Sequence, residues 1–315
     1  MGKYIPRYVR AYEDGSLEKK IEEAYKILEK CTLCPRECKV NRLKGEKGIC
    51  KTGELPIVSS FFAHFGEEDP LVGKHGSGTI FISRCNLLCM YCQNYEISHL
   101  GEGREITLDI FAQIMLSLQE QGCHNINIVT PTHVVPQLLG ALKIAVERGL
   151  SIPLVYNTSG YDKVETLKIL DGIVDIYMPD FKYWDPKVAK RYSKAPDYPE
   201  VARKALKEMH RQVGDLRINE QGIAEEGLLV RHLVLPHGLA NTKEIMEFIA
   251  NEISPNTYVN VMAQYRPCGE AYKDSYLNRS LTLEEYEEAL KAAIKAGITR
   301  LDEAQKRFLL RFRFI

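Results

Sequence analysis

The sequence predicts an α/β protein built around a parallel sheet, in the form of a partial (β/α)6 barrel. Two observations predict it: short apolar segments alternate with helix-length amphipathic stretches, and this β-then-α unit occurs six times from residue 79 onward. Six units favour an open or partial barrel over a closed eight-unit one, and a doubly wound sheet stays the alternative. In either architecture, functional residues follow the carboxyl ends of the strands.

Three segments precede the first unit. Leu17, Ile21 and Leu28 have helical spacing and predict a helix over 17–30. A loop rich in cysteine, glycine and proline follows over 31–53, and a strand-like run over 57–65 leads into the turn-rich stretch 67–78. We therefore expect an N-terminal helix and metal-binding segment over 1–56 and a barrel over 57–300.

Each of the six units pairs a strand with the helix or helices after it. In chain order they are 79–83 with 108–120, 125–130 with 136–148, 153–157 with 164–170, 174–179 with helices reaching 209, 228–236 with 242–251, and 258–265 with 283–296. The chain then ends in a tail over 301–315 that interleaves basic and apolar residues. We expect this tail to pack on the barrel or lie exposed, and we assign it no function.

Composition excludes several classes of protein. The chain has 315 residues, 45% of them hydrophobic and 27% charged, which excludes a disordered or fibrous protein. Lys and Arg number 42, as do Asp and Glu, so overall charge does not indicate a nucleic-acid partner. No apolar run approaches the roughly 20 residues of a membrane span, and the N-terminus lacks a signal-peptide core. We expect a cytoplasmic protein with neither a nucleic-acid nor a membrane partner.

Cysteine content points to metal or redox chemistry. There are nine cysteines, seven of them between Cys31 and Cys92, while Cys123 and Cys268 stand alone. An odd number in a chain expected to be cytoplasmic argues against a disulfide framework.

Three of these cysteines form a compact motif directly after the first predicted barrel strand. Cys85, Cys89 and Cys92 have the spacing Cys-x3-Cys-x2-Cys. Three thiolates suit three corners of a [4Fe–4S] cluster and leave one iron free for a ligand that is not protein. The alternative is a zinc knuckle that takes its fourth ligand from Cys123, Cys268 or a histidine.

This spacing, with Tyr91 just before the last cysteine, resembles the signature of the radical S-adenosylmethionine (SAM) superfamily. The resemblance implies that the free iron binds SAM and that reductive cleavage yields a 5′-deoxyadenosyl radical for hydrogen abstraction. It also implies a low-potential electron donor of the flavodoxin or ferredoxin type. More narrowly, the chain is similar to the group related to pyruvate formate-lyase activating enzyme, which implies glycyl-radical activation of a partner protein as one possible function. The matching segments are 31–42, 76–98, 130–136, 156–162, 175–184, 230–236 and 259–268.

The resemblance and the strand ends together suggest where SAM binds. Asp180 and Lys182 match an Asp-Leu-Lys segment of the activating enzymes, with a local ion pair as the alternative. Thr130 stands in a segment that departs from their Gly-Gly-Glu. His133 in that segment is a ligand, an acid/base group or a cap of the following helix. Arg231 is expected to bind a carboxylate or to form a salt bridge inside the barrel. The candidate SAM contacts are Tyr91, Thr130, Asn157, Ser159, Asp180, Lys182, Arg231 and Gln264.

A second cysteine set lies in the N-terminal loop. Cys31, Cys34, Cys38 and Cys50 supply four thiolates within twenty residues, enough for a closed zinc site or a second iron–sulfur cluster. The loop is too polar to fold by apolar burial alone, so a metal is physically reasonable. The competing reading of the whole chain is a non-catalytic iron–sulfur electron carrier or a zinc-stabilised scaffold.

Overall fold

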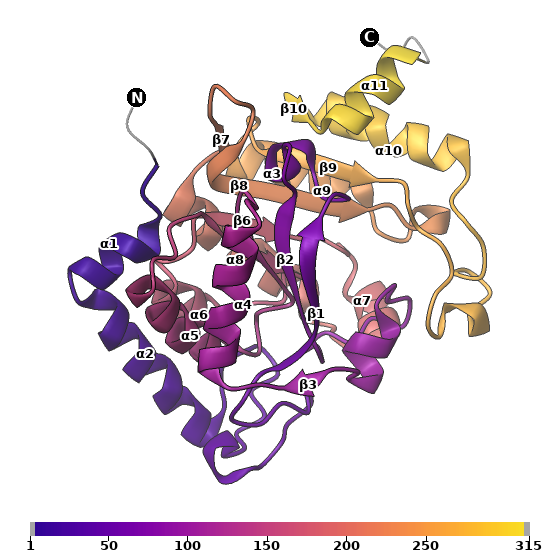
Figure 1. The fold of residues 1–315 in the computed structure, drawn as a ribbon. Helices are drawn as coiled ribbons and strands as arrows, with labels where there is room; N and C mark the ends of the chain where they lie inside the picture. Colours follow the sequence, from indigo (N-terminus) through magenta and orange to yellow (C-terminus); the bar gives the residue numbers. More distant parts are fainter. Residues whose placement is uncertain (1–3, 312–315) are drawn as a thin grey trace.

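A parallel six-stranded core forms the centre of the computed structural model, which describes residues 4–311 (Figure 1). Its strands, in spatial order, are β9 (Tyr258–Met262), β8 (Ala224–Leu233), β6 (Ile176–Pro179), β5 (Leu154–Thr158), β4 (Ile126–Val129) and β2 (Ser77–Ile82). Each neighbouring pair is parallel. These are the six strands predicted from the sequence, so the fold class is confirmed.

Short strands extend this core at both edges. β1 (Ile57–His64) runs antiparallel to β2 and carries β3 (Arg104–Glu105) on its outer side. β10 (Arg300–Leu301) runs parallel to β9 at the other edge, and β7 (Arg217–Ile218) pairs with β8. Since β3 and β10 stand at opposite ends of the strand order, the sheet stays open, as expected of a partial barrel.

Helices follow the strands as predicted. They are α4 (Leu108–Glu120), α5 (Val135–Glu147), α6 (Val164–Ile169), α7 (Pro186–Ser193), α8 (Tyr198–Val213), α9 (Thr242–Phe248) and α10 (Leu283–Ala296). Side-chain caps fix three of their starts: the Thr107 hydroxyl accepts from the amide of Ile110, the Asp185 carboxylate accepts from the amide of Lys187 at the start of α7, and Thr282 forms a capping box with Glu285. None of the described helices is long and apolar enough to cross a membrane.

The N-terminal helices pack on the barrel. α1 (Arg7–Glu13) and α2 (Ser16–Ile27) lie beside α5 and α6, whereas α10 lies on the other side of the molecule (Figure 1). Arg7 forms ion pairs with Asp171 and Glu226, at 3.1 and 2.7 Å, and the Tyr8 hydroxyl donates to the carbonyl of Ile152. The start of α1 is thus anchored to residues that lie far along the chain.

The structure differs from the sequence prediction at several boundaries. β9 ends at Met262 rather than at 265, because the chain leaves the sheet and the carbonyl of Gln264 accepts from Gln93 of the cysteine loop. α1 and α3 (Asp69–Val72) were not anticipated, and α11 (Glu303–Arg311) forms where the sequence predicts a tail that packs on the barrel or lies exposed. α11 lies within the predicted tail and packs Phe308 against Tyr286, with ring centroids 5.0 Å apart. Residues 312–315 of that tail lie outside the described part of the chain.

Candidate active site at the strand ends

A cavity of about 570 Å³, lined by polar and apolar atoms in nearly equal measure, opens inside the sheet. Its lining includes the cysteine loop at the carboxyl end of β2 and also Glu67 and Glu68, which follow β1. Because β1 is antiparallel to β2, these two carboxylates lie toward the opposite end of that strand pair. The cavity therefore extends along the interior of the partial barrel, and its volume falls within the usual range for small-molecule sites.

The three predicted cluster cysteines all border this cavity. The loop that carries them turns tightly: the backbone φ is +73° at Arg84 and +61° at Leu88, a region that non-glycine residues rarely adopt. Burial raises the pKa of Cys85 to about 12, so its ionised form requires a cation. Burial also raises the pKa of Cys92.

Each of these sulfurs accepts a hydrogen bond. The amide of Leu87 donates to Sγ of Cys85 at 3.3 Å. The hydroxyl of Ser193 donates to Sγ of Cys89 at 3.1 Å, and that of Ser98 to Sγ of Cys92 at 3.2 Å. Donors of this kind stabilise the negative charge that thiolate sulfurs carry in iron–sulfur sites. The donor set therefore fits a [4Fe–4S] cluster held by three cysteines.

Arg36 braces the cysteine loop from outside the cavity. Its guanidinium donates to four backbone carbonyls, those of Asn86 (2.9 Å), Leu87 (3.1 Å), Ser193 (3.0 Å) and Lys194 (2.6 Å). It also lies 5.2 Å from the ring centroid of Tyr161. Sequence reasoning missed this residue because Arg36 looked like one of many polar residues in the N-terminal loop. It connects the two cysteine segments directly.

All eight predicted SAM contacts line the same cavity. Asp180 and Lys182 form an ion pair of 2.6 Å, so the local pairing considered as an alternative is present within the cavity wall. Burial alone would lower the pKa of Lys182, but the neighbouring Asp180 and Cys89 raise it above its ordinary value, and the side chain stays a cation. Their role as SAM ligands stays a prediction.

Two further candidates carry features that suit a ligand. The Ser159 hydroxyl is buried and has no hydrogen-bond partner among the described residues, which is unusual for a buried polar atom. Thr130 has a backbone φ of +65°, a strained conformation at the end of β4. The ring of Tyr91 packs edge-on against Tyr183 and Tyr265, so its backbone is the part available to a ligand.

Arg231 occupies the cavity wall together with two carboxylates that were not anticipated. It donates to both carboxylate oxygens of Glu68, at 2.7 Å each, and to Glu67. Asn260 donates to Glu68 at 2.6 Å. Although burial raises the pKa of Glu68, the adjacent Arg231 outweighs it and holds that pKa below its ordinary value. The salt-bridge alternative for Arg231 is thus the arrangement formed, and SAM contact by this residue stays a prediction.

Two buried histidines, His133 and His232, make contacts within the fold and do not line the cavity. His133 neither lines the cavity nor caps α5; its Nε2 lies 3.0 Å from the carbonyl of Ser83, and its own carbonyl accepts from Arg42. His232 faces away from Arg231 and contacts the carbonyl of Phe181 and the hydroxyl of Thr242. Burial lowers the pKa of each histidine to about 4, so both are neutral near pH 7.

The isolated cysteines lie away from the cavity lining. Cys123 is buried in the core and Cys268 is half-buried. Among residues 4–311, no group of three or more histidine, cysteine or acidic side chains is arranged to hold a single metal ion.

Comparison with known proteins identifies the family of this chain. Residues 79–249, more than half of the chain, match the family model described as the Radical SAM superfamily. An uncharacterized protein of Methanocaldococcus jannaschii is 35% identical over 292 residues, covering 90% of this chain and 79% of its own. The crystal structure of HydG, a maturase of the [FeFe]-hydrogenase, is similar with a TM-score of 0.47 and 13% identity; the match covers 70% of this chain and about half, 49%, of that one. On the evidence of its family-model match, the chain belongs to the radical SAM superfamily.

Proposed function

We propose that this radical SAM enzyme belongs to the group related to pyruvate formate-lyase activating enzyme and removes a hydrogen atom from a substrate held in the strand-end cavity. One observation carries the proposal: the three motif cysteines and the eight candidate SAM contacts line a single cavity. When bound, the cluster and SAM supply a 5′-deoxyadenosyl radical that abstracts hydrogen.

The residues of the chain have distinct tasks in this proposal. Cys85, Cys89 and Cys92 hold the cluster. Asp180 accepts from the amino group of SAM, and Lys182 pairs with its carboxylate, since both side chains face the cavity and carry the required charges. The Ser159 hydroxyl, buried and unpartnered in the same wall, supplies a further hydrogen bond.

The hydrogen donor is the finer part of the proposal. The resemblance to the activating enzymes favours a glycine in a partner protein, and a small molecule is the second version. In both, a low-potential donor of the flavodoxin or ferredoxin type supplies the electron. Electron paramagnetic resonance (EPR) of a candidate partner tests the first version through a glycine-centred radical. Transfer of deuterium from a labelled small molecule into 5′-deoxyadenosine tests the second.

The reaction class is tested by anaerobic reconstitution with iron and sulfide, reduction, and addition of SAM. We expect 5′-deoxyadenosine from the parent protein and none from Cys89→Ala. Cys123→Ala is the matched control, because it also removes a buried thiol but lies outside the cavity lining. Equal product from Cys89→Ala and the parent would refute the assignment. An intact, reducible cluster that never cleaves SAM would instead identify an electron carrier.

A further inference from the structure

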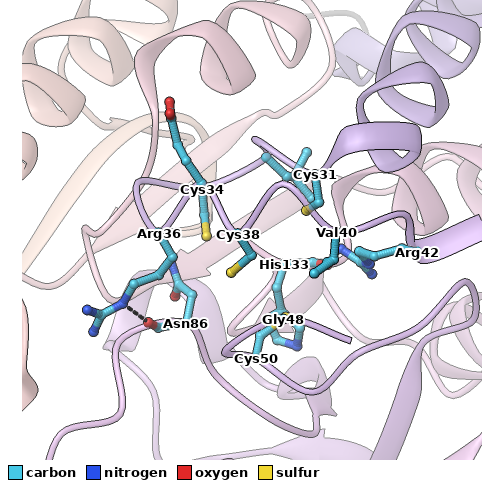
Figure 2. Close-up of a pocket in the computed structure, with 12 residues that line it drawn as sticks. Cys31, Cys34, Arg36, Cys38, Val40, Arg42, Gly48, Cys50, Asn86 and His133 are labelled. Carbon is cyan, nitrogen blue, oxygen red and sulfur yellow. Dashed lines mark hydrogen bonds between the residues drawn. The ribbon is translucent and has the colours of Figure 1, made fainter. Parts of the chain in front are cut away.

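Two cavities of very different size are lined by residues that the sequence singles out. Cys31, Cys34, Cys38 and Cys50 surround one of about 10 Å³, shown in Figure 2, which is about the room that one water molecule needs. A metal at these four cysteines stays a prediction. The strand-end cavity, at about 570 Å³, has the size of a small-molecule site. The charge of its lining therefore bears on which substrate it can hold.

One end of the strand-end cavity carries more carboxylates than cations. We call it the carboxylate end, and the lining residues that form it are Glu67, Glu68, Arg231, Asn260, Asp302 and Gln305. Glu67 and Glu68 both pair with Arg231, and their side chains are only 7% and 1% exposed. Asp302 adds a third carboxylate, which accepts from the hydroxyl of Tyr258 at 2.9 Å. A single guanidinium therefore leaves negative charge at this end without a matching cation.

The charged groups nearby leave this excess in place. Nδ1 of His64 lies 4.0 Å from Glu67, but it accepts from the amide of Gly66 and so carries no proton of its own. Arg307 pairs with Asp69 at 3.5 Å, and both of these side chains are exposed. The other cations among the described lining residues follow β2 and β6, where the cysteine loop lies, and they are Arg84 and Lys182.

A chain of hydrogen bonds determines which atom of Gln305 is free. The carboxylate of Glu68 can only accept, so the Asn260 atom that lies 2.6 Å from it is Nδ2. Asn260 then presents its Oδ1 to Gln305, whose Nε2 donates to it at 3.1 Å. Oε1 of Gln305 has no hydrogen-bond partner among the described residues, although the residue is only 4% exposed. A buried amide oxygen in this position requires a donor.

We propose that the carboxylate end binds a cationic group of the substrate, an ammonium or a guanidinium, through Glu67 and Oε1 of Gln305. The inference rests on the proposed function, because it takes this cavity to hold the substrate. Each oxygen of Glu67 accepts one hydrogen bond, from Asn127 or Arg231, and can accept one more. A cation donates to these acceptors and supplies the missing positive charge. An apolar group would leave the acceptors unpaired, and an anion would add to the excess charge.

The test compares three capped amino acids that differ in charge. They are the Nα-acetyl N-methylamides of L-lysine, L-norleucine and L-glutamate. Equilibrium dialysis against the anaerobically reconstituted, oxidised protein with SAM present measures each dissociation constant. We expect the lysine derivative to bind about 10- to 100-fold more tightly than the norleucine derivative, and the glutamate derivative to bind most weakly. Equal binding of the lysine and norleucine derivatives, or tightest binding of the glutamate derivative, would overturn the proposal.

Two single variants locate the binding. Gln305→Met keeps the length of the side chain and removes the free oxygen, whereas Glu67→Gln removes one negative charge. Each should lower the preference for the lysine derivative by about 10-fold. Gln137→Met is the matched control and should keep the parental preference, because Gln137 is also buried with an unpartnered Oε1 but lies outside the lining of this cavity.

Folding of the variants is checked by circular dichroism. A parental preference in folded Gln305→Met and Glu67→Gln would overturn the proposal, and if one variant does not fold, the other variant and the parental comparison decide. Dialysis does not depend on SAM cleavage. A parent that makes 5′-deoxyadenosine but does not distinguish the three derivatives would refute this inference alone. A parent that prefers the lysine derivative but never cleaves SAM would refute the proposed function alone.

Discussion

Replacing Arg36 with alanine should destabilise the loop that carries Cys85, Cys89 and Cys92, although Arg36 itself does not line the strand-end cavity. Three of its four hydrogen bonds are at least partly buried, those to the carbonyls of Asn86, Leu87 and Ser193. At about 1 kcal/mol each, together with about 0.5 kcal/mol for the contact with the Tyr161 ring, the loss is about 3.5 kcal/mol. For a 315-residue chain, unfolding entropy near 2.1 cal/mol/K per residue converts this loss to a fall of about 5 °C in Tm.

The assay is thermal unfolding of the apoprotein, followed by iron retention after anaerobic reconstitution. Arg36→Lys should recover little, because a single ammonium cannot reach the carbonyls that the planar guanidinium bridges. The matched control is Arg203→Ala, which removes an arginine whose guanidinium lies 4.7 Å from the ring centroid of Trp184. We expect it to cost under about 1 kcal/mol. If Arg36→Ala melts within about 1 °C of the parent and keeps its iron, the hydrogen bonds of Arg36 do not stabilise the cysteine loop and the prediction is wrong.

Three further predictions concern the cavity. Asp180→Ala and Lys182→Ala should each weaken SAM binding by about 30- to 150-fold, the equivalent of roughly 2–3 kcal/mol, while the iron content stays at the parental level. Titration with SAM followed by EPR measures the affinity. Parental affinity in both variants would refute the assignment of these residues as SAM ligands. Glu68→Gln should destabilise the fold by about 3 kcal/mol by breaking the buried pair with Arg231. Because the folded-state pKa of Glu68 is lowered, the stabilisation from this pair should be complete above about pH 4.5 and should disappear as the pH falls through the folded pKa. The urea unfolding midpoints of parent and variant should therefore converge in acid. A difference between the two midpoints that stays constant with pH would contradict the pairing. Ser98→Ala should make the reduction potential of the cluster more negative by roughly 20–60 mV, because the hydroxyl of Ser98 stabilises the reduced cluster, which carries more negative charge. This range follows from 1 kcal/mol corresponding to about 43 mV for one electron. An unchanged potential in a redox titration would exclude charge stabilisation by this hydroxyl.

Much of the barrel and the cavity wall followed from local pattern. Alternation of apolar strands with amphipathic helices identified the six parallel strands, and parallel strands bring their carboxyl ends to one edge. Asn157 and Asp180 therefore meet at one cavity although 22 intervening residues separate them. The cysteine motif was visible because its spacing is local to a single loop.

The remaining site residues depend on contacts that no local pattern encodes. Glu67 and Glu68 lie in a turn-rich stretch without periodicity, and Glu68 meets Arg231 across 163 positions of sequence. The signal that was present is Arg231 itself, since an arginine facing the interior from a strand requires a carboxylate. The sequence indicates that Arg231 needs a carboxylate partner, but it does not indicate which carboxylate pairs with it. Arg36 left no such signal, because its partners are backbone carbonyls.

The bond from Arg36 to the carbonyl of Ser193 spans 157 positions, which bears on the order of events during synthesis. At roughly 5–20 residues per second, about 8–30 s separate the appearance of these two residues on the ribosome. The loop of Cys31, Cys34, Cys38 and Cys50 is made first, and the loop of Cys85, Cys89 and Cys92 follows. Both are made before α7, which contains Ser193. A nascent chain therefore presents all seven clustered thiols before the contact between Arg36 and Ser193 can form.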